Sequence, residues 1–290
     1  EDAVKCPVSI VVLTRNKLEI TRLCLPTILH SSCRPLELIV VDNASTDGTR
    51  EWLENFAGTA ERANVRTTLV FNSRPEGCST ARNQAIDRAS GDVLIFVDND
   101  VAVRTRRWIE ILLDTLLSSP DICMVGPKLV YPFPPHPIQC AGVGISRTGR
   151  VQFIGRGEPR DDPRFCSRRE TQCLISACLM ARRQPVVQAG GFDEEFNPVQ
   201  FEDFDLCYRL REKGLKTVYE PAAEMYHMES VTTAGTPEVH NPAVVVRHGL
   251  LFKRKWRHMF EREKGPPDSE TRWKRLQFPP LSSVTELPLV

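Results

Sequence analysis

The sequence predicts an α/β fold with a mostly parallel central sheet and helices on both of its faces. Between Val8 and Leu117, short apolar runs of strand length alternate with segments of helical periodicity, which is the pattern of βαβ units. Some of these runs are continuous rather than alternating, as is typical of strands buried on both faces. The chain has 290 residues, enough to bury one large core.

The first half of the chain gives the clearest alternation. The expected strands are Val8–Leu13, Leu36–Val41, Thr67–Phe71 and Val93–Val97. The segments of helical spacing that follow them are Leu18–Leu29, Thr49–Phe56, Thr80–Ala89 and Trp108–Leu117. Because this βαβ rhythm is typical of nucleotide-binding folds, we interpret residues 1–100 as a nucleotide-binding half.

A proline-rich segment, Tyr131–Pro137, interrupts the alternation. Short strands, glycine turns and polar loops follow as far as Arg169, and we interpret them as an insertion or flap over the site. Beyond it we expect an apolar strand-like run, a helix and a short strand, at Leu174–Met180, Phe201–Arg211 and Lys216–Tyr219. We expect one domain over residues 1–260.

The C-terminal region is predicted to contain one basic helix and a tail. Spacing indicates a helix over Ala243–Phe260, within a basic segment at 241–260. Its basic face with interleaved apolar residues suits contact with an anionic inner membrane, packing on the domain or a homodimer interface, and we favour the last two. Residues 261–290 are rich in proline and charge and are expected to be poorly ordered.

Composition narrows the class of protein. The chain carries 38 basic and 37 acidic side chains, so it lacks the positive field of a nucleic-acid binder, and we expect no nucleic acid partner. Its ten cysteines include no C-x-x-C, and several stand singly in apolar patterns, so we expect reduced, mostly buried thiols in a cytoplasmic protein. No apolar stretch reaches the roughly 20 residues of a membrane helix.

Acidic residues follow the fourth expected strand directly. Asp98, Asn99 and Asp100 come after the apolar run from Val93 to Val97. Open α/β sheets bind ligands at the carboxyl ends of their strands, and two carboxylates there can hold a hard divalent cation against phosphate oxygens. The alternative is that Asp98 and Asp100 only cap the next helix, and the motif alone does not decide between the two.

The first two strands also end in polar residues. The first ends in Thr14, Arg15 and Asn16 instead of G-x-G-x-x-G, which disfavours a hydride-transfer dehydrogenase. Thr14 and Asn16 can cap the next helix. The second ends in Asp42 and Asn43, where the carboxylate can accept a hydrogen bond from a nucleobase imide; capping does not explain Asp42 well.

Taken in order, seven segments resemble the motifs of family 2 inverting glycosyltransferases of the GT-A fold. These are Thr14–Asn16, Val41–Thr49, Gly77 with Ala81–Asn83, Asp98–Asp100, Gly190–Glu194, Phe201–Asp203 and His227. The match spans roughly Val8 to Phe260. The Val-Asp-Asn-Ala-Ser variant with a basic C-terminal helix is similar to bacterial rhamnosyltransferase-like members. The resemblance implies a GT-A nucleotide-diphospho-sugar transferase domain, with residues 101–240 as its acceptor and metal half.

The resemblance also implies roles for individual residues. It places the nucleotide on Thr14, Arg15, Asn16, Asp42, Asn43, Gly77, Arg82, Asp98 and Asn99. It implies a Mn²⁺ or Mg²⁺ ion held by Asp100 and His227, with Asp98 nearby. Donor sugar or acceptor would contact Ser176, Gly191, Asp193 and Glu194. Taken alone, His227 is better explained as a structural residue.

The inverting mechanism requires a carboxylate that removes the proton of the acceptor hydroxyl. The resemblance points to Asp203, with Glu202 as the second candidate. The competing interpretation is that Glu202, Asp203 and Asp205 form an acidic first turn that complements the helix dipole. The acidic cluster follows an aromatic-flanked loop, and this favours the catalytic interpretation.

We therefore expect transfer of a single sugar from a UDP- or dTDP-linked donor to a hydroxyl of a glycan, a lipid-linked glycan or another acceptor. The Gln-x-x-Arg-Trp motif of processive polysaccharide synthases is missing. Two alternatives stay open, a sugar nucleotidyltransferase and a non-catalytic nucleotide-sugar-binding scaffold. The first normally needs a glycine-rich phosphate loop after the first strand, which Thr14–Asn16 does not provide.

Overall fold

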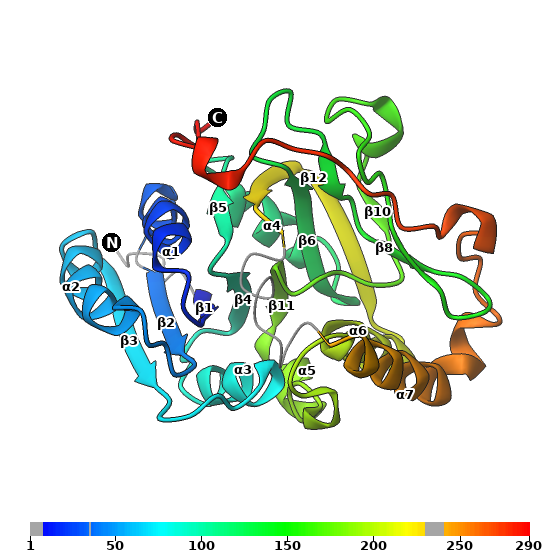
Figure 1. Cartoon of the computed structure of the whole chain (residues 1–290). Helices are drawn as coiled ribbons and strands as arrows, with labels where there is room; N and C mark the ends of the chain where they lie inside the picture. Colours follow the sequence, from blue (N-terminus) through cyan, green and yellow to red (C-terminus); the bar gives the residue numbers. More distant parts are fainter. Residues whose placement is uncertain (1–7, 35, 230–240) are drawn as a thin grey trace.

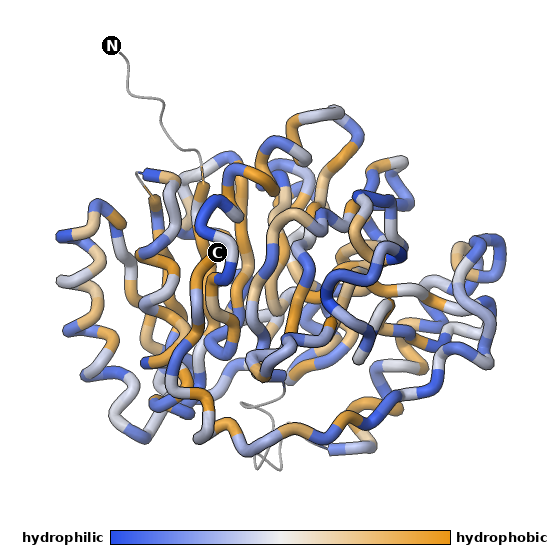
Figure 2. Tube along the Cα trace, turned by 90° about the horizontal axis from the view of Figure 1, so that it is seen from above, coloured by the Kyte–Doolittle hydropathy of each residue, from blue (hydrophilic) through white to orange (hydrophobic). Residues whose placement is uncertain are grey.

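The α/β prediction is confirmed by a computed structural model, which describes residues 8–34, 36–229 and 241–290 (Figure 1). Its main sheet has the strand order β10-β12-β6-β11-β4-β1-β2-β3, with β5 and β7 as additional short strands. Helices pack against this sheet along its length. Hydrophobic positions gather along the central strands in Figure 2, where the core lies.

The N-terminal half contains the four expected strands as a parallel unit. These are β1 (Val8–Thr14), β2 (Leu36–Asp42), β3 (Val65–Phe71) and β4 (Val93–Asp98). Their register pairs Thr14 with Asp42 and Leu13 with Asp98, so these strand ends lie side by side. The helices of this half are α1 (Leu18–Cys24), α2 (Thr49–Arg62) and α3 (Cys78–Ile86).

The first helix is shorter than its periodicity indicated. After α1 the chain continues as a 3₁₀ helix, η1 (Leu25–His30), with Pro26 in its first turn. Proline lacks the N–H that an α-helix interior needs, so the α-helix ends before it. The expected helices beginning near Thr49 and Thr80 are confirmed, but α2 continues to Arg62, beyond the expected end at Phe56, and α3 lies slightly earlier in the chain than expected.

The remaining strands complete the sheet around β11 (Cys178–Arg182), which runs antiparallel between β4 and β6. β6 (Ile122–Val130) pairs in parallel with the long strand β12 (Lys216–His227). The short strands on this side are β5 (Val101–Val103), β7 (Ile138–Cys140) and β10 (Arg169–Glu170), and β8 (Val143–Ile145) pairs with β9 (Val151–Phe153) in a separate hairpin. Short strands were expected in this region.

Strand β6 was not foreseen, although all of its residues are buried. Its sequence contains Gly126, Pro127 and Lys128, which break the apolar pattern of a central strand. Pro127 pairs with Glu220 beside a register shift that separates Glu220 from Glu224 in β12. A bulge is one of the few places where a sheet tolerates proline, so this irregularity accommodates Pro127.

The C-terminal helices pack through aromatic residues. The helices after β5 are α4 (Trp108–Leu117), α5 (Arg183–Gln188), α6 (Glu202–Glu212) and α7 (Pro242–Phe260). On α7, Phe252, Trp256 and Phe260 are buried, and the ring centroids of Phe252 and Tyr208 are 5.4 Å apart. The basic helix therefore packs on the domain, as one of the expected alternatives stated. No helix in the described ranges combines the length and apolarity needed to cross a membrane.

The last thirty residues differ from the expectation of poor order. They leave α7, pass along the molecule and reach the region of β5 and α1 (Figure 1). The Val290 N–H donates to the Arg104 carbonyl at 2.7 Å, and the Val290 carbonyl accepts from Arg106. Leu281 and Leu287 pack on a buried cluster that includes Tyr226. Apolar side chains that lie between prolines hold this segment against the domain. The overall composition of the segment does not show where these apolar residues stand.

The cysteine expectation holds for most of the described thiols. Eight are free, and six of these are buried: Cys24, Cys123, Cys140, Cys173, Cys178 and Cys207. Cys33, by contrast, is disulfide-bonded, which the sequence interpretation did not anticipate.

Candidate functional site

A cavity of about 940 Å³ lies where the carboxyl ends of β1 and β4 meet the start of α6. It collects many of the residues that the sequence singled out. The predicted residues that line it are Arg15, Asn43, Gly77, Arg82, Asp98, Asn99, Asp100, Ser176, Glu202, Asp203 and His227. Segments from both halves of the chain therefore form one site.

Arg82 of α3 links two of the acidic motifs. One guanidinium nitrogen lies 2.9 Å from Asp98 at the end of β4, and another lies 2.8 Å from Glu202 at the start of α6. Burial opposes the charge on Arg82, but its acidic neighbours outweigh burial and raise the pKa of the guanidinium. The second carboxylate oxygen of Glu202, Oε2, is buried and has no hydrogen-bond partner among the described residues. This cluster has more acceptors than donors.

Asp203 lies next to Glu202 in the first turn of α6, and its side chain is buried in the cavity wall. One carboxylate oxygen accepts from the Ser176 N–H at 3.0 Å, and the other accepts from the Phe204 N–H at 2.9 Å. Burial, followed by the negative charge of Glu202, raises the pKa of Asp203 to about 7. A carboxyl group with a pKa in this range can exchange a proton near neutral pH, which is favourable for a general base.

Asp100 and His227 face each other across the cavity wall, with the imidazole Nε2 3.6 Å from an Asp100 oxygen. The other ring nitrogen, Nδ1, lies 3.2 Å from the Gln139 Oε1, while the Gln139 amide N–H₂ donates to Glu229. Since Gln139 uses its nitrogen for the carboxylate, its oxygen must accept from Nδ1–H. In the neutral imidazole this tautomer makes Nε2 the acceptor nitrogen, on the side of the Asp100 carboxylate.

Such a pair of acceptors suits a shared cation, which gives a test for the implied metal. Asp100 and His227 supply one carboxylate oxygen and one imidazole nitrogen, and Gln139 orients the imidazole as hydrogen-bonded neighbours of metal ligands do. No group of three or more His, Cys, Asp and Glu side chains suited to a metal occurs within the described residues. The donor set therefore fits an ion that takes the rest of its ligands from water and substrate phosphates, as Mg²⁺ usually does.

Gly77 begins α3 and contacts the loop before α6. Its φ of +86° is a left-handed conformation that favours glycine, and an added Cβ would lie 2.4 Å from Asn197 Oδ1. The same Asn197 oxygen accepts from the Ser79 N–H at 3.1 Å. The close approach that requires glycine here is thus that of Asn197, which ties the 197–201 loop to α3.

Thr14, Asn16 and Asp42 are not among the residues that line the cavity, although all three belong to the described chain. Both carboxylate oxygens of Asp42 accept from Ser45, one from its hydroxyl and one from its N–H. The Asn16 side chain accepts from Thr46 at 2.7 Å. These side chains fix the loops after β1 and β2, and Asn43 and Arg15 are the neighbours that reach the cavity.

Of the four residues expected to contact donor sugar or acceptor, Ser176 lines the cavity. Gly191, Asp193 and Glu194, all described, do not line it. The carboxylate of Asp193 lies 2.6 Å from Lys255 of α7, and Asn83 contacts both Glu194 and the backbone next to Gly191. The Gly190–Glu194 segment thus fastens helices α3 and α7 together.

Sequence reasoning missed several lining residues. Gln139 and Glu229 show no motif, and Phe153 comes from the region that we interpreted as a flap. Trp273 also lines the cavity, from within the segment expected to be poorly ordered. A tryptophan in a charged, proline-rich segment was the available signal, and the composition of the segment concealed it.

Comparison with known proteins places these features in a family. The family model described as Glycosyl transferase family 2 matches residues 9–183. The chain is 31% identical over 260 residues to the uncharacterized protein y4gI of Sinorhizobium fredii, which covers 86% of this chain and 27% of that protein. It is 30% identical over 226 residues to the N-acetylglucosaminyl-diphospho-decaprenol L-rhamnosyltransferase of Mycobacterium tuberculosis, and that match covers 71% of each chain.

A solved structure agrees at the level of the fold. The chain superposes on the crystal structure of GalNAc-T7 with UDP, GalNAc and Mn²⁺ with a TM-score of 0.63 and 16% identity, covering 76% of this chain and 43% of that one. The carboxyl-end cavity, the acidic strand ends and the GT-A fold thus agree with the family match over most of the first two thirds of the sequence. The chain belongs to glycosyl transferase family 2.

Proposed function

We propose that the protein is a metal-dependent inverting glycosyltransferase that moves one sugar from a UDP- or dTDP-linked donor to a hydroxyl acceptor. The observation that carries this proposal is that Asp203, with a pKa near 7, shares one cavity with the Asp100 and His227 pair. A base and a cation site are the two elements that the reaction needs. Membership of the family supports the same reaction class.

The donor would occupy the strand-end side of the cavity. Arg15 and Asn43 follow β1 and β2, and Asp98 and Asn99 follow β4, so this side suits the nucleoside and its diphosphate. Arg82 would act indirectly, by holding Asp98 and Glu202 in place, since its guanidinium forms ion pairs with both of these carboxylates. Thr14, Asn16 and Asp42 would support the loops beneath the nucleotide.

The divalent ion would be held by Asp100 and His227, with Asp98 beside them. When bound it would neutralise charge on the diphosphate as that group leaves. Gln139 would orient the imidazole through Nδ1, so that Nε2 is the ring nitrogen presented to the ion. Mn²⁺ and Mg²⁺ are both compatible with this donor set.

Asp203 would accept the proton of the acceptor hydroxyl. The hydroxyl oxygen forms a bond to the anomeric carbon, the bond from that carbon to the diphosphate oxygen breaks, and the proton passes to the Asp203 carboxylate. Attack from the face opposite the leaving group inverts the anomeric centre. The Ser176 N–H and hydroxyl orient the carboxylate, lying 3.0 Å and 3.4 Å from the same oxygen. Glu202 is engaged with Arg82 and suits the role less well.

A lipid-linked acceptor is the favoured substrate class. The rhamnosyltransferase relative carries a diphospho-decaprenol acceptor in its name. The outward side of α7 keeps Val246 and Leu250 exposed together with Arg247, Arg254 and Arg257, which is the composition of a helix that rests on an anionic surface. We propose a peripheral contact at this stripe. A homodimer through the same stripe is the competing use of it.

The test begins with the donor, because the acceptor is unknown. Binding by calorimetry and release of nucleoside diphosphate are measured across uridine, thymidine and guanosine diphosphate sugars with Mn²⁺, Mg²⁺ or chelator. We expect metal-dependent binding of one uridine or thymidine donor. Absence of binding to every donor with either metal would overturn the proposal in favour of a scaffold, and formation of a nucleotide sugar from a sugar phosphate and a nucleoside triphosphate would favour a nucleotidyltransferase.

The base is tested with Asp203→Asn. We expect transfer to fall by about 10²- to 10⁴-fold, the usual contribution of a general base, while donor affinity is retained. Asp114→Asn, at an exposed position of α4 outside the cavity lining, is the matched control. Equal loss of donor binding and transfer in Asp203→Asn would assign Asp203 to binding instead of proton transfer.

A further inference from the structure

Trp273 is an exposed aromatic residue at a functional cavity. Its exposed fraction is 58%, which places it among the large hydrophobic residues left open to solvent, and it also lines the cavity that contains Asp203. It comes from the segment after α7, about seventy residues beyond Asp203 in the chain. Exposure of an indole to water is unfavourable, and a ligand in the cavity that covered the ring would remove this cost.

The indole is held in place from one side. The Arg156 guanidinium carbon lies 3.8 Å from the centre of the Trp273 ring, so the cation covers one face, and Phe153 packs edge-on with ring centroids 5.4 Å apart. Arg156 is fixed in turn by a paired contact with Glu229 and by the Lys274 carbonyl, which accepts from its Nε at 3.0 Å. A rigid ring with one covered face and more than half of its surface open is organised to stack on a ligand.

The same contacts connect Trp273 to the centre of the site. Glu229 accepts hydrogen bonds from Arg156, from the Tyr131 hydroxyl at 2.8 Å and from the Gln139 amide at 3.2 Å. Gln139 contacts His227 at 3.2 Å. A continuous polar chain therefore runs from the imidazole of the site to the indole.

The chemistry around the indole favours a sugar ring over an aliphatic chain. Polar side chains, Gln139, Glu229, Asn197 and Gln200, line the same cavity as Trp273 and Phe153. A pyranose has a face of C–H groups that can lie on an aromatic ring and hydroxyls at its edge that need hydrogen-bond partners. Gln139, Glu229 and Asn197 are already bonded within the protein, but the exposed Gln200 amide at the cavity can bond to such hydroxyls, whereas an aliphatic chain would make no hydrogen bond to it.

We propose that Trp273 is the platform on which the sugar ring of the acceptor stacks, so that one of its hydroxyls reaches Asp203. This inference rests on the proposed glycosyltransferase function and deepens it, because it gives the acceptor a sugar at its reacting end. Trp273 contributes to acceptor specificity and has no part in donor binding. The segment that carries it is then a component of the active site.

The experiment measures binding first, since that needs no turnover. Intrinsic tryptophan fluorescence of the full chain is followed during titration with octyl glycosides of glucose, galactose, N-acetylglucosamine, mannose and rhamnose. Octyl tetraethylene glycol, which has the same alkyl chain without a sugar, is the reference probe. Trp108 and Trp256 are buried, and the partly exposed Trp52 lies on α2 outside the cavity lining, so Trp273 should dominate a response to a ligand in the cavity. We expect at least one glycoside to change the emission and the reference probe to leave it unchanged.

Three variants separate stacking from simple apolar contact. Trp273→Phe keeps a smaller ring, Trp273→Leu keeps an apolar side chain without a ring, and Trp52→Phe on α2 is the control outside the cavity lining. With the best glycoside as acceptor, we expect KM for the acceptor to rise about tenfold or more in Trp273→Leu and less in Trp273→Phe, by analogy with the loss of one aromatic stacking partner. The Trp52→Phe control should match the parent in acceptor KM, donor hydrolysis and melting temperature.

The outcomes distinguish this inference from the proposed function. If glycosides bind and depend on Trp273 but no nucleotide sugar is hydrolysed, the platform stands and the transferase proposal fails. If donors are hydrolysed but no glycoside perturbs the emission, or Trp273→Leu transfers as well as the parent, the platform is wrong. A response to octyl tetraethylene glycol equal to that of the glycosides would assign the subsite to the lipid chain instead, and would equally overturn it.

Discussion

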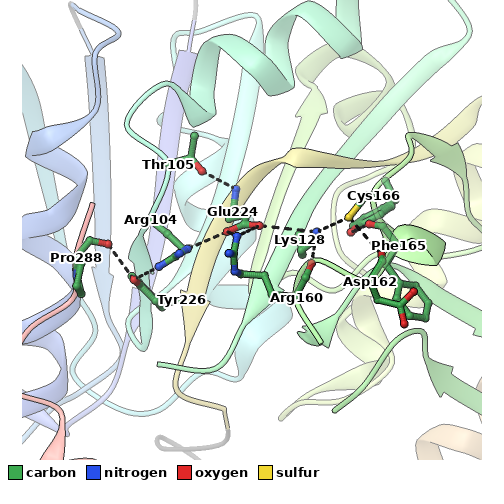
Figure 3. Close-up of polar contacts among 11 residues, drawn as sticks. Arg104, Thr105, Lys128, Arg160, Asp162, Phe165, Cys166, Glu224, Tyr226 and Pro288 are labelled. Carbon is green, nitrogen blue, oxygen red and sulfur yellow. Dashed lines mark hydrogen bonds and ion pairs between the residues drawn. The ribbon is translucent and has the colours of Figure 1, made fainter. Parts of the chain in front are cut away.

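Two buried charge clusters in this protein contain the same kinds of charged residue, but in one the carboxylates outnumber the cations and in the other the cations outnumber the carboxylates. The Arg82 cluster, formed by Arg82, Asp98 and Glu202, lines the cavity and has one cation for two carboxylates. The Glu224 cluster, shown in Figure 3, has one carboxylate among three cations. Glu224 lies 2.8 Å from Arg104, 3.3 Å from Arg160 and 3.8 Å from Lys128.

The two clusters differ in whether their carboxylate oxygens are fully paired. Both oxygens of Glu224 accept hydrogen bonds from Arg160, and Lys128 has a further partner in the Arg160 carbonyl at 2.7 Å. In the Arg82 cluster, Glu202 Oε2 is buried without a partner in the described residues. A buried acceptor left unpaired costs free energy of folding, so a surplus of acceptors at a cavity indicates a place completed by a ligand or a proton.

The largest expected effect comes from removing the charge of Glu224. Glu224→Gln leaves Arg104, Lys128 and Arg160 without their shared anion, so the free energy of unfolding should fall by about 3 kcal/mol. Glu202→Gln should cost less than about 1 kcal/mol, because its amide oxygen still accepts from Arg82 and a repulsion with Asp203 is removed. Urea unfolding of both variants measures the contrast. Equal losses of stability would show that the two clusters do not differ in kind.

An intermediate effect is expected from Arg82→Met, which keeps an unbranched stem and removes the charged guanidinium. Asp98 and Glu202 would then lie near Asp203 without a cation between them, so we expect transfer to fall by tenfold or more, equivalent to about 1.4 kcal/mol in the barrier. Arg160→Met is the matched change in the other cluster and should lower stability while sparing transfer. If Arg160→Met reduces transfer as much as Arg82→Met does, the assignment of the Arg82 cluster to transfer and of the Glu224 cluster to stability is wrong.

The smallest effect is a displacement along the pH axis. The pKa of Asp203 is raised in the folded protein, from an ordinary 3.8 to about 7, so the native state holds a proton that the unfolded chain releases. Stability linked to this group is therefore present at low pH and declines as pH rises from about 4 to 7, whereas transfer, which needs the ionised base, rises over the upper part of that range.

The two clusters should respond differently in this measurement. Glu202→Gln removes a charge that raises the pKa of Asp203, so the midpoint of the pH–rate profile should move to lower pH. Glu224→Gln should leave the midpoint where it is. Profiles of kcat at saturating donor give both values, and a midpoint that ignores Glu202 but follows Glu224 would count against Asp203 as the titrating base.

The parts of the site that could be predicted are those encoded locally. Asp98 and Asp100 end an apolar strand, and Glu202 and Asp203 begin a helix, so chain position alone brings them to the sheet edge. Asp42 and Asp193 show the limit. The sequence identified them as polar residues in the right segments, but it could not show that Ser45 and Lys255 would occupy their carboxylates, because these contacts depend on packing.

Long-range placement also explains what was missed in the fold. Pro127 hid strand β6, since local rules exclude proline from a central strand unless a partner strand supplies a bulge. The role of Trp273 was missed because charge and proline content describe how a segment behaves when it is isolated. In the folded chain Trp273 is held by Arg156 and Phe153, which lie more than a hundred residues earlier. Neither partner is visible from the residue itself.

The bulge in β12 determines which face of the sheet each later side chain of that strand points toward. Between Glu220 and Glu224 the strand contains three residues that have no counterpart between Pro127 and Lys128. Because side chains alternate across a sheet, their number decides which neighbour faces which way, and here His227 lines the cavity while Tyr226 is buried in a separate apolar cluster. Lengthening residues 221–223 by one would bring the Tyr226 phenol to the place of the imidazole at the proposed cation site, and shortening them by one would bring the Met228 thioether there, with no residue of the site substituted. The number of residues in segment 221–223 therefore decides which side chain of β12 faces the cavity.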